Sequence, residues 1–511
     1  MYRNAERDAR AALSGLVAVG SGVAAGELTA LAVSPFASPY EAVAAFLVDH
    51  APAAAREFAI MTFGTKDKSA LMLGLGAVIV MLSIGAGLLQ ARRPPYGLVI
   101  VAGFAGFGVL AALTRPTARL LFMVPPVVSG LVAALVLAAL CRGLTPRRAE
   151  AMPASGWSRR QFAGAVGVLV VASAAGVLVA RRARDAGGVV AERLHLRLPT
   201  AGSPAPPIPA AVELNLDGAT GFIASATDFY RIDTALSVPR LSVRDWRLRI
   251  HGMVDREITL GWDDLVALQS IERIITLTCV SNEVGGDLAS NARWLGFPMK
   301  ELLSRVGVHP DADMLLSTSV DGWTSGTPLS VITDGRDAML AIGMNGRPLP
   351  LEHGYPVRQV VPGLYGFVSA CKWVIDWEIT RFDDAQAYWT KRGWGVRAPI
   401  KTASRIDRPA PLSQHPPGRI VVAGTAWAQH RGIRGVEVRV DDGPWRPATL
   451  TAQYSTDTWR QWSWNWDADA GQHTLYCRAT DDTGQMQPEN RVAPIPDGAT
   501  GWHSRVIRIV A

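Results

Sequence analysis

Five long apolar stretches lie in the N-terminal part of the chain, and they constrain its fold more than any other feature. They run from Ala11 to Val33, Ala70 to Leu89, Tyr96 to Leu113, Leu120 to Leu140 and Phe162 to Ala180. A helix needs about 20 predominantly apolar residues to cross a hydrocarbon core of about 30 Å. Because buried helices of soluble proteins are rarely this long and this free of charge, the sequence predicts five transmembrane helices.

Composition supports a membrane part joined to further domains. Only 19% of the 511 residues are charged and the mean hydropathy is +0.16, which is unusual for a soluble enzyme. A chain of this length is expected to form two or three domains. The formal net charge of +7 comes from arginines that flank apolar segments, so we predict no nucleic-acid partner. The cysteines form no CxxC pair, and a disulfide framework is not predicted; they are Cys141, Cys279, Cys371 and Cys477.

The distribution of basic residues predicts the orientation of the helices. With the N-terminus inside, the cytoplasmic segments carry Arg3, Arg7, Arg10, Arg92, Arg93, Arg142, Arg147, Arg148, Arg159 and Arg160, and the opposite segments carry Arg56, Lys66, Lys68, Arg115 and Arg119. The excess of positive charge places the N-terminus in the cytoplasm. Four crossings then return the chain to the cytoplasm just before the fifth stretch.

The pentapeptide SRRQF at 158–162 precedes that fifth stretch and resembles a twin-arginine export signal. An ordinary positively charged flank is the alternative. An internal signal has no cleavage site that would free the following domain, so the fifth helix is expected to remain as an anchor. The rest of the chain is therefore predicted on the extracytoplasmic side of the cytoplasmic membrane.

Few ionisable groups lie within the predicted spans. Glu27 has no cationic partner in these stretches, so a role in helix packing or near the interface is at least as consistent as a functional one. The apolar but charge-interrupted segment 41–61 predicts an interfacial helix or re-entrant cover. No histidine lies in the five stretches, so no haem is predicted; the histidines are His50, His195, His251, His309, His353, His415, His430, His473 and His503.

The segment TCVSNEVGG, from Thr278 to Gly286, is the most informative stretch after the apolar ones. The preceding IERIITL, from Ile271 to Leu277, mixes β-branched residues with two-residue alternation and predicts a strand. Cys279 then lies at the end of a strand, and two glycines allow a tight turn or a close approach to a ligand. A thiolate there could bind a transition metal, although these nine residues alone fit a buried, inert cysteine better.

Downstream motifs strengthen the interpretation of Cys279 as a metal ligand. The segment is followed by NARWLGFPMKELL at 291–303, HGYPVRQVVPG at 353–363 and CKW at 371–373. From about Phe229 to the C-terminus, these motifs resemble the sulfite oxidase family of molybdopterin enzymes, in the family's order. The resemblance implies a molybdenum–molybdopterin cofactor with the Cys279 thiolate as metal ligand, and two-electron oxygen-atom transfer on a small-molecule substrate.

The resemblance also implies which residues contact the pterin. Its phosphate needs charge-assisted donors, and Arg358 offers a bidentate fork, Lys372 a point charge and His353 a further donor. The positions that match the family's pterin contacts are Tyr230, Arg231, Asp321, His353, Arg358, Ala370, Cys371 and Lys372. Cys371 itself is expected to be a packed thiol and not a second metal ligand.

Two positions depart from the sulfite-oxidising pattern. Val284 replaces an arginine that lies five residues after the metal cysteine, and Trp394 stands where the family's active-site tyrosine aligns. Because sulfite is a dianion, losing that arginine weakens its binding, and Glu283 adds negative charge. Arg431 and Arg460 could supply charge only if the C-terminal domain reaches the site.

The catalytic set implied by this alignment is therefore Cys279, Arg231 and Trp394. An S- or N-oxide is the favoured substrate class, and sulfite oxidation is the alternative. Electrons would pass to a separate partner, either a quinone or a soluble redox protein. A non-catalytic binding protein on the same fold is the rival of another class, but it would have no reason to keep the metal thiolate. A transporter is disfavoured by the scarcity of intramembrane polar groups.

The predicted organisation follows from these segments. Residues 1–184 form an all-α membrane region, 185–220 a proline-rich extended linker, and 221–395 an α+β molybdopterin-binding domain. Short alternating strands from residue 396 to 511 predict an immunoglobulin-like β-sandwich. In the family this domain often mediates dimerisation, which leaves a homodimer open for this chain.

Overall fold

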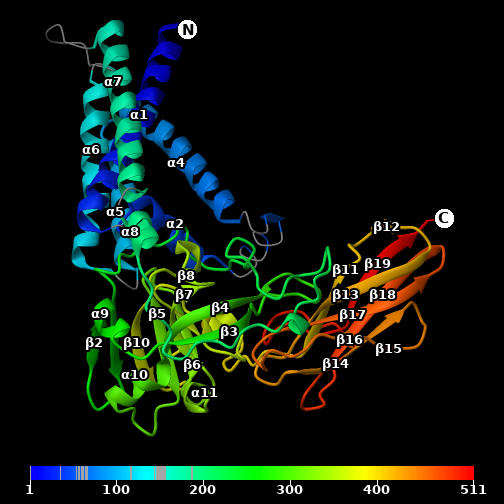
Figure 1. Cartoon of the computed structure of the whole chain (residues 1–511). Coiled ribbons are helices and arrows are strands. Elements are labelled where there is room, and N and C mark those ends of the chain that lie inside the picture. The colour runs from blue at the N-terminus through cyan, green and yellow to red at the C-terminus, as the bar shows by residue number, and fades with distance from the viewer. Residues whose placement is uncertain are drawn as a thin grey trace, which may run out of the picture. The chain divides into compact units, whose positions relative to one another are not determined.

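The computed structural model describes residues 2–34, 36–52, 55, 58, 62–63, 67–115, 118–142, 144, 157–185 and 188–510. The chain divides into two compact units, of which the first comprises Met1–Ala191 with Ala235–Val238 and the second Glu192–Thr234 with Pro239–Ala511. Figure 1 shows the helical first unit in blue and cyan and the strand-rich second unit in green to red. Of the basic residues used to predict orientation, Arg56, Lys66, Arg147 and Arg148 lie outside the described residues.

The first unit is all helical. Its elements are α1 (Tyr2–Val33), α2 (Pro39–His50), α4 (Asp67–Arg92), α5 (Tyr96–Leu113), η2 (Leu120–Met123), α6 (Val124–Leu140) and α7 (Arg159–Asp185). Within the described residues, five segments are long and apolar enough to cross a membrane: Ala5–Val33, Lys68–Arg92, Tyr96–Leu113, Leu120–Leu140 and Arg159–Ala183. The five helices predicted from the apolar stretches are therefore confirmed as helices of that length and character.

Small residues let α1 approach its neighbours closely. A Cβ added at Gly15 would lie within 3.0 Å of the Ser83 backbone on α4, and one at Gly87 would meet the Ala11 backbone in the same way. On another face, a Cβ added at Gly22 would meet the Ser129 backbone on α6. Membrane helices associate through such small-residue contacts because lipid gives apolar side chains no reason to pair. α1 thus forms the centre of the helical unit.

A short helix, α2, covers one end of α1. Its N-cap residue Ser38 accepts a hydrogen bond from the Glu41 backbone N–H at 3.3 Å, and its hydroxyl donates to Glu27 Oε1 at 2.7 Å. Glu27 is buried. α2 ends at His50, and the last part of the predicted interfacial segment 41–61 falls largely outside the described residues.

Four residues from later in the chain belong to the helical unit. The Lys68 ammonium donates to the Ala235 carbonyl at 2.8 Å, and the Ser237 hydroxyl donates to Glu41 Oε2 at 3.1 Å. Segment 235–238 therefore has polar partners at the starts of α2 and α4, although the chain on both sides of it belongs to the second unit.

The second unit begins with a mixed α/β layer structure. One sheet has the strand order β2-β1-β10-β5-β6, and the other has the order β3-β4-β7-β8 with β9 paired to β7. The bounds are β1 (Arg247–Gly252), β2 (Ile258–Gly261), α9 (Trp262–Val266), β3 (Ile271–Thr278), β4 (Ala289–Pro298), α10 (Met299–Val306), β5 (Met314–Ser319), β6 (Thr324–Pro328), α11 (Leu329–Thr333), β7 (Met339–Met344), β8 (Arg347–Pro348), β9 (Arg358–Val360), α12 (Gly366–Ser369) and β10 (Val374–Thr380).

The C-terminal part is the predicted β-sandwich. Its sheets have the orders β11-β13-β17-β16 and β12-β19-β18-β14-β15. The bounds are β11 (Ala403–Arg408), β12 (Gln414–His415), β13 (Gly418–Trp427), β14 (Ile433–Val440), β15 (Arg446–Pro447), β16 (Thr449–Leu450), β17 (Arg460–Ala468), β18 (Gly471–Asp481) and β19 (His503–Ile509). Inward-facing residues such as Val422, Trp462, Leu475 and Ile507 form its core.

The proline-rich segment, predicted as an extended linker, makes contacts with the rest of the second unit. α8 (Val189–His195) crosses the boundary between the units, and η3 (Ala210–Val212) buries Val212 in the core of the second unit. The Pro206 carbonyl accepts a hydrogen bond from the Tyr454 hydroxyl at 2.7 Å. Proline composition predicts an extended backbone, which is also the conformation that lets a segment lie along the surface of a domain.

Candidate active site

Cys279 follows β3 directly, where the sequence predicts it. Its backbone N–H donates to the Leu288 carbonyl at 2.9 Å, and its carbonyl accepts from the Asn282 backbone N–H at 3.1 Å. The side chain is buried, and burial raises the pKa of the thiol above its usual value, while the Lys372 charge acts in the opposite direction. A buried thiol beside an ammonium group is poised to ionise when it gains a cationic ligand.

The loop after Cys279 is held by the β-sandwich. Gly285 has a φ of +80°, and a Cβ added there would lie within 3.0 Å of the His503 ring. Arg405 Nη1 donates to the Gly286 carbonyl at 2.7 Å. The two glycines therefore allow a tight turn, as predicted, but what approaches them in this structure is another part of the chain.

β3 itself is also fixed from the β-sandwich. Gln429 Nε2 donates to the Thr278 hydroxyl at 2.8 Å and to the Thr276 carbonyl at 3.2 Å, and the Trp459 backbone N–H donates to the Thr276 hydroxyl at 2.8 Å. These bonds hold the last residues of β3 before Cys279. The position of the thiol is consequently set by two domains and not by its own loop alone.

Arg358 is a buried cation with no carboxylate partner among the residues that the structure describes. Its guanidinium donates to the His353 carbonyl at 3.1 Å and lies 5.1 Å from the centre of the Trp294 ring. Burial lowers its pKa to about 10. His353 is also buried, its Nε2 bonds the Ala226 carbonyl at 3.0 Å, and burial followed by the Arg358 charge lowers its pKa to about 4. His353 is therefore a neutral donor at physiological pH.

Lys372 adds a second buried cation next to Arg358. Its ammonium pairs with Asp233 Oδ2 at 2.8 Å and donates to the Glu352 carbonyl at 3.0 Å. Burial lowers its pKa to about 8, and Asp233 opposes that shift. The same Asp233 oxygen accepts from Arg231 Nε at 3.0 Å, so one carboxylate is shared by two cations. Arg231, Lys372 and Asp233 together therefore carry a net positive charge.

We call the cluster formed by His353, Arg358, Lys372 and Asp233 the basic pocket. Two tyrosines lie near the Cys279 thiol, and one of them also lies near Arg358. A Cβ added at Gly366, at the start of α12, would lie 3.7 Å from the Tyr230 hydroxyl and 3.7 Å from the Thr278 carbonyl. Burial raises the pKa of Tyr230, with a further contribution from Cys279. Burial also raises the pKa of Tyr365 to about 12, and Cys279 again contributes. Both phenols are therefore neutral and close to the thiol.

Tyr365 was missed by the sequence interpretation. It lies in the segment PGLYGF, between the two motifs that carry the resemblance, and a tyrosine between glycines there is the signal that could have identified it. Its hydroxyl accepts a hydrogen bond from the Lys401 backbone N–H at 3.4 Å. The Asp233–Lys372 pair was missed as well, because the two residues are far apart in sequence.

The remaining predicted residues fall into two groups. Ala370 and Cys371 lie beside Arg358, whose Nη2 donates to the Ala370 carbonyl at 3.5 Å; Cys371 is wholly buried, as a packed thiol would be. Asp321 accepts from the Trp323 backbone N–H at 3.2 Å and contributes to the raised pKa of Cys371. These residues belong to the basic pocket.

The second group contains the positions that depart from the sulfite-oxidising pattern and their neighbours. Trp394 packs 6.0 Å from Phe367 of α12 and 6.2 Å from Trp389, measured between ring centres. Val284 is half-buried in the loop after Cys279, and Glu283 is exposed. Trp394 therefore packs against α12, the helix that begins beside the thiol.

Arg431 and Arg460, the two residues of the C-terminal domain that could supply charge in place of an arginine at position 284, have other partners. Arg431 pairs with Asp481 at 2.9 Å and donates to the Ile400 carbonyl at 2.9 Å, although its charge reaches Tyr365. Arg460 donates to the Thr451 and Ile433 carbonyls, both within the sandwich. Among the described residues, no group of three or more His, Cys, Asp or Glu side chains could hold a metal. Any metal at this site would rely on a single protein thiolate.

Comparison with known proteins adds independent evidence. A family model described as an oxidoreductase molybdopterin binding domain matches residues 235–389, and a bacterial Ig domain model matches residues 404–476. The mouse protein "Sulfite oxidase, mitochondrial" is 29% identical over 337 residues, which cover 54% of this chain and 60% of the relative. The Bacillus subtilis protein "Uncharacterized oxidoreductase YuiH" is 30% identical over 152 residues, 30% of this chain and 73% of the relative.

One solved structure is also similar. The sulfane dehydrogenase SoxCD from Paracoccus pantotrophus matches with a TM-score of 0.49 and 25% sequence identity, over 57% of this chain and 84% of that chain. The chain spans about 60% of the length of the mitochondrial sulfite oxidases that it matches. The match therefore does not assign the activity of those whole proteins to this chain.

Proposed function

Because the chain belongs to the sulfite oxidase family of molybdopterin-dependent oxidoreductases, we propose that it catalyses two-electron oxygen-atom transfer with Cys279 as the protein ligand of molybdenum. Buried Arg358, which lacks a carboxylate partner among the described residues, is the observation that carries this assignment. A buried cation costs several kcal/mol of desolvation unless an anion accompanies it. The phosphate of molybdopterin is an anion of the required kind.

The residues around Arg358 fit that phosphate. Arg358 can present a planar fork and Lys372 a compact ammonium, so the two charged donors differ in geometry. The neutral His353 ring lies beside them, and its one N–H already donates to the Ala226 carbonyl. Asp233 compensates only part of the positive charge, because it is shared between Lys372 and Arg231. When bound, a molybdenum–molybdopterin group supplies the oxygen-atom transfer itself.

The protein's own part is to hold and shield that centre. Cys279 would contribute its thiolate as the protein ligand of the metal, whose positive charge would offset the cost of a buried thiolate. Tyr230 and Tyr365 stay protonated, and each phenol could donate a hydrogen bond to a group held beside Cys279. Cys371, buried and packed, has no part in the reaction.

We assign the substrate to neutral or singly charged oxides, such as a sulfoxide or an N-oxide. Val284 offers no charge, and the guanidinium groups of Arg431 and Arg460 already donate to other partners. A doubly charged oxyanion would therefore have fewer charge-assisted bonds here than in a site with an arginine at position 284. Sulfite oxidation is the second candidate, because Arg231 and Arg431 lie near enough to contribute charge to Lys372 and Tyr365.

We further propose that the chain is anchored in the cytoplasmic membrane by the five apolar helices, with the second unit on the extracytoplasmic side. The arginine distribution and the SRRQF pentapeptide support this orientation. A non-catalytic binding protein is disfavoured because Cys279 is present beside an intact basic pocket.

Removing the thiolate tests the assignment. We expect Cys279→Ser to abolish turnover with an artificial electron donor while leaving much of the pterin bound, since Arg358 and Lys372 remain. Metal analysis and pterin fluorescence after release measure the two quantities separately. Cys477→Ser, which changes a buried cysteine in the core of the β-sandwich, is the matched control and should keep both turnover and molybdenum. Stoichiometric zinc without molybdenum in the unmodified protein would refute the proposal.

A further inference from the structure

The helical unit contains a large, partly open hollow that the proposed oxidoreductase chemistry does not use. It has a volume of about 470 Å³ and is lined by residues of α1, α2, α4, α5 and α6. Its lining is apolar apart from Glu27, Tyr40 and Ser129. Cavities of roughly 300–1,000 Å³ with a mainly apolar wall and a few polar groups are typical of small-molecule sites.

The packing of the helices explains why this space exists. α1 and α4 touch backbone to backbone at the pair Gly15 and Gly87, and α4 then inclines away from α1 in Figure 1. Beyond the crossing, Gly103 of α5 lines the hollow without a side chain, and an added Cβ there would meet no heavy atom within 4 Å. A larger residue at position 103 would occupy part of this space.

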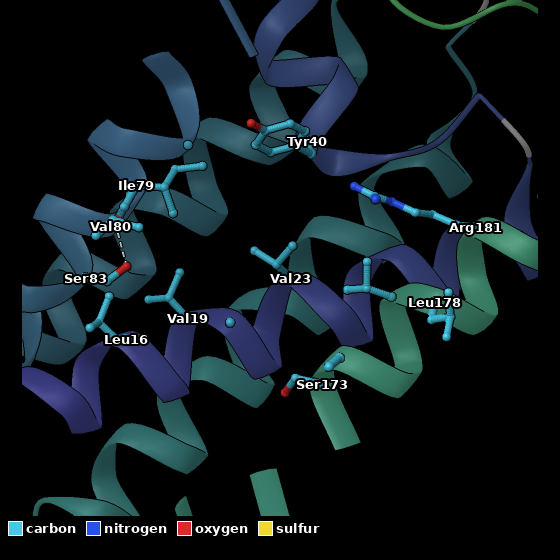
Figure 2. A pocket seen from close by; sticks show the side chains of 14 residues that line it. Leu16, Val19, Val23, Tyr40, Ile79, Val80, Ser83, Ser173, Leu178 and Arg181 are labelled. Carbon is cyan, nitrogen blue, oxygen red and sulfur yellow. Dashed lines mark hydrogen bonds between the residues drawn. The ribbon is translucent and has the colours of Figure 1, made fainter. Parts of the chain in front are cut away.

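A second hollow adjoins the first. It has a volume of about 600 Å³, lies among α1, α4 and α7, and shares Val19, Val23, Tyr40 and Ile79 with the inner cavity. In Figure 2, Val19 and Val23 project from α1 into this space, and Arg181 extends toward it from α7. The two hollows together resemble an inner chamber with an apolar channel leading to it.

The inner chamber has a polar end suited to a carbonyl or hydroxyl group. Glu27 is more than nine-tenths buried and accepts a hydrogen bond from Ser38 at 2.7 Å. A carboxyl group can donate to a carbonyl when protonated and accept from a hydroxyl when ionised. Phe104 and Phe107 line the same chamber and offer faces or edges to a planar ring.

We propose that this chamber binds the ring of a lipid-soluble quinone or quinol, with the isoprenoid tail in the channel between α4 and α7. A planar ring with two oxygens and a long apolar tail matches a mainly apolar chamber that has one polar end and is joined to an apolar groove. A phospholipid matches less well, because its phosphate would meet the Glu27 carboxyl in the chamber and its acyl chains need no polar partner. The choice of a redox-active ring rests on the proposed function, whereas the cavity itself does not.

The test uses the full-length protein in nanodiscs and two probes, a benzoquinone and a naphthoquinone that each carry two isoprene units. Equilibrium binding is expected at micromolar concentrations for one or both. Gly103→Leu places a side chain in the chamber and should weaken binding about a hundredfold or abolish it, and leucine is a better helix former than glycine. Gly85→Leu is the matched control on α4, at a position with open space outside the lining, and should bind normally.

A second variant addresses the polar end. Glu27→Leu removes the carboxyl and should weaken binding of the quinone probes about two- to tenfold, as loss of one neutral hydrogen bond predicts. Phospholipid as the sole bound molecule after extraction, or equal affinity in the Gly103→Leu protein, would overturn the proposal. Cys279→Ser should bind quinone normally, so failure of the molybdenum assignment and failure of this inference give different results.

Discussion

Gly285→Ala is the most direct test of whether the β-sandwich positions Cys279. An alanine at a φ of +80° costs about 1–2 kcal/mol from the left-handed backbone alone. Its Cβ would also lie within 3.0 Å of the His503 ring, where carbon atoms prefer about 3.5–4.0 Å. Overpacking of this kind costs about 1–3 kcal/mol. The total is about 2–5 kcal/mol, unless the loop moves and carries Cys279 with it.

The matched control is Gly346→Ala. Gly346 has a φ of +75°, and an added Cβ there meets no heavy atom within 4 Å. It therefore has the backbone cost without the collision. We expect Gly285→Ala to lower molybdenum content and the temperature of half-inactivation well below the values for Gly346→Ala, measured by metal analysis and by residual turnover after heating.

A double variant separates collision from strain. His503→Ala removes the ring but also leaves the Ile406 backbone N–H without its acceptor at 2.9 Å, which costs about 1–3 kcal/mol. The double variant with Gly285→Ala should then be less impaired than the sum of the single variants, because only one of them retains the collision. If Gly285→Ala and Gly346→Ala behave alike, the β-sandwich does not constrain the cysteine loop and the reasoning fails.

Two further predictions concern the substrate and the export of the enzyme. Val284→Arg adds one charge-assisted bond of about 1.5–3 kcal/mol, so steady-state kinetics in matched salt should show kcat/KM for sulfite rising about ten- to a hundredfold relative to a sulfoxide; high sulfite efficiency in the unmodified enzyme would reverse our ranking. Arg159→Lys with Arg160→Lys keeps the positive flank but removes the proposed signal, so protease protection in spheroplasts should find residues 185–511 in the cytoplasm; unchanged external exposure would make these arginines an ordinary flank.

The pattern of apolar residues along the sequence was sufficient to predict the long helices and several strands. The apolar stretches predict the long helices, and alternation in Ile271–Leu277 predicts β3, which the structure ends at Thr278. The strands of the β-sandwich were predicted in the same way. In each case the side-chain period is fixed by the element itself, so no distant residue is needed to recognise it.

The support of the site could not be predicted because it is made by distant contacts. Arg405 bonds Gly286, and Gln429 bonds Thr278, across more than a hundred residues. None of these residues belongs to a pattern that a single sequence reveals. The pairing of Asp233 with Lys372 is of the same kind, and it decides how much positive charge remains for a ligand.

The short segment 235–238 has a consequence for any attempt to obtain the enzyme in soluble form. A cut in the proline-rich segment would delete Lys68 and Glu41, which hold Ala235 and Ser237, while leaving Asp233 attached only two residues earlier. The excised fragment would carry an unsupported stretch of backbone next to a residue that balances the charge of Lys372. Expression of the second unit without the helices should therefore impair cofactor loading.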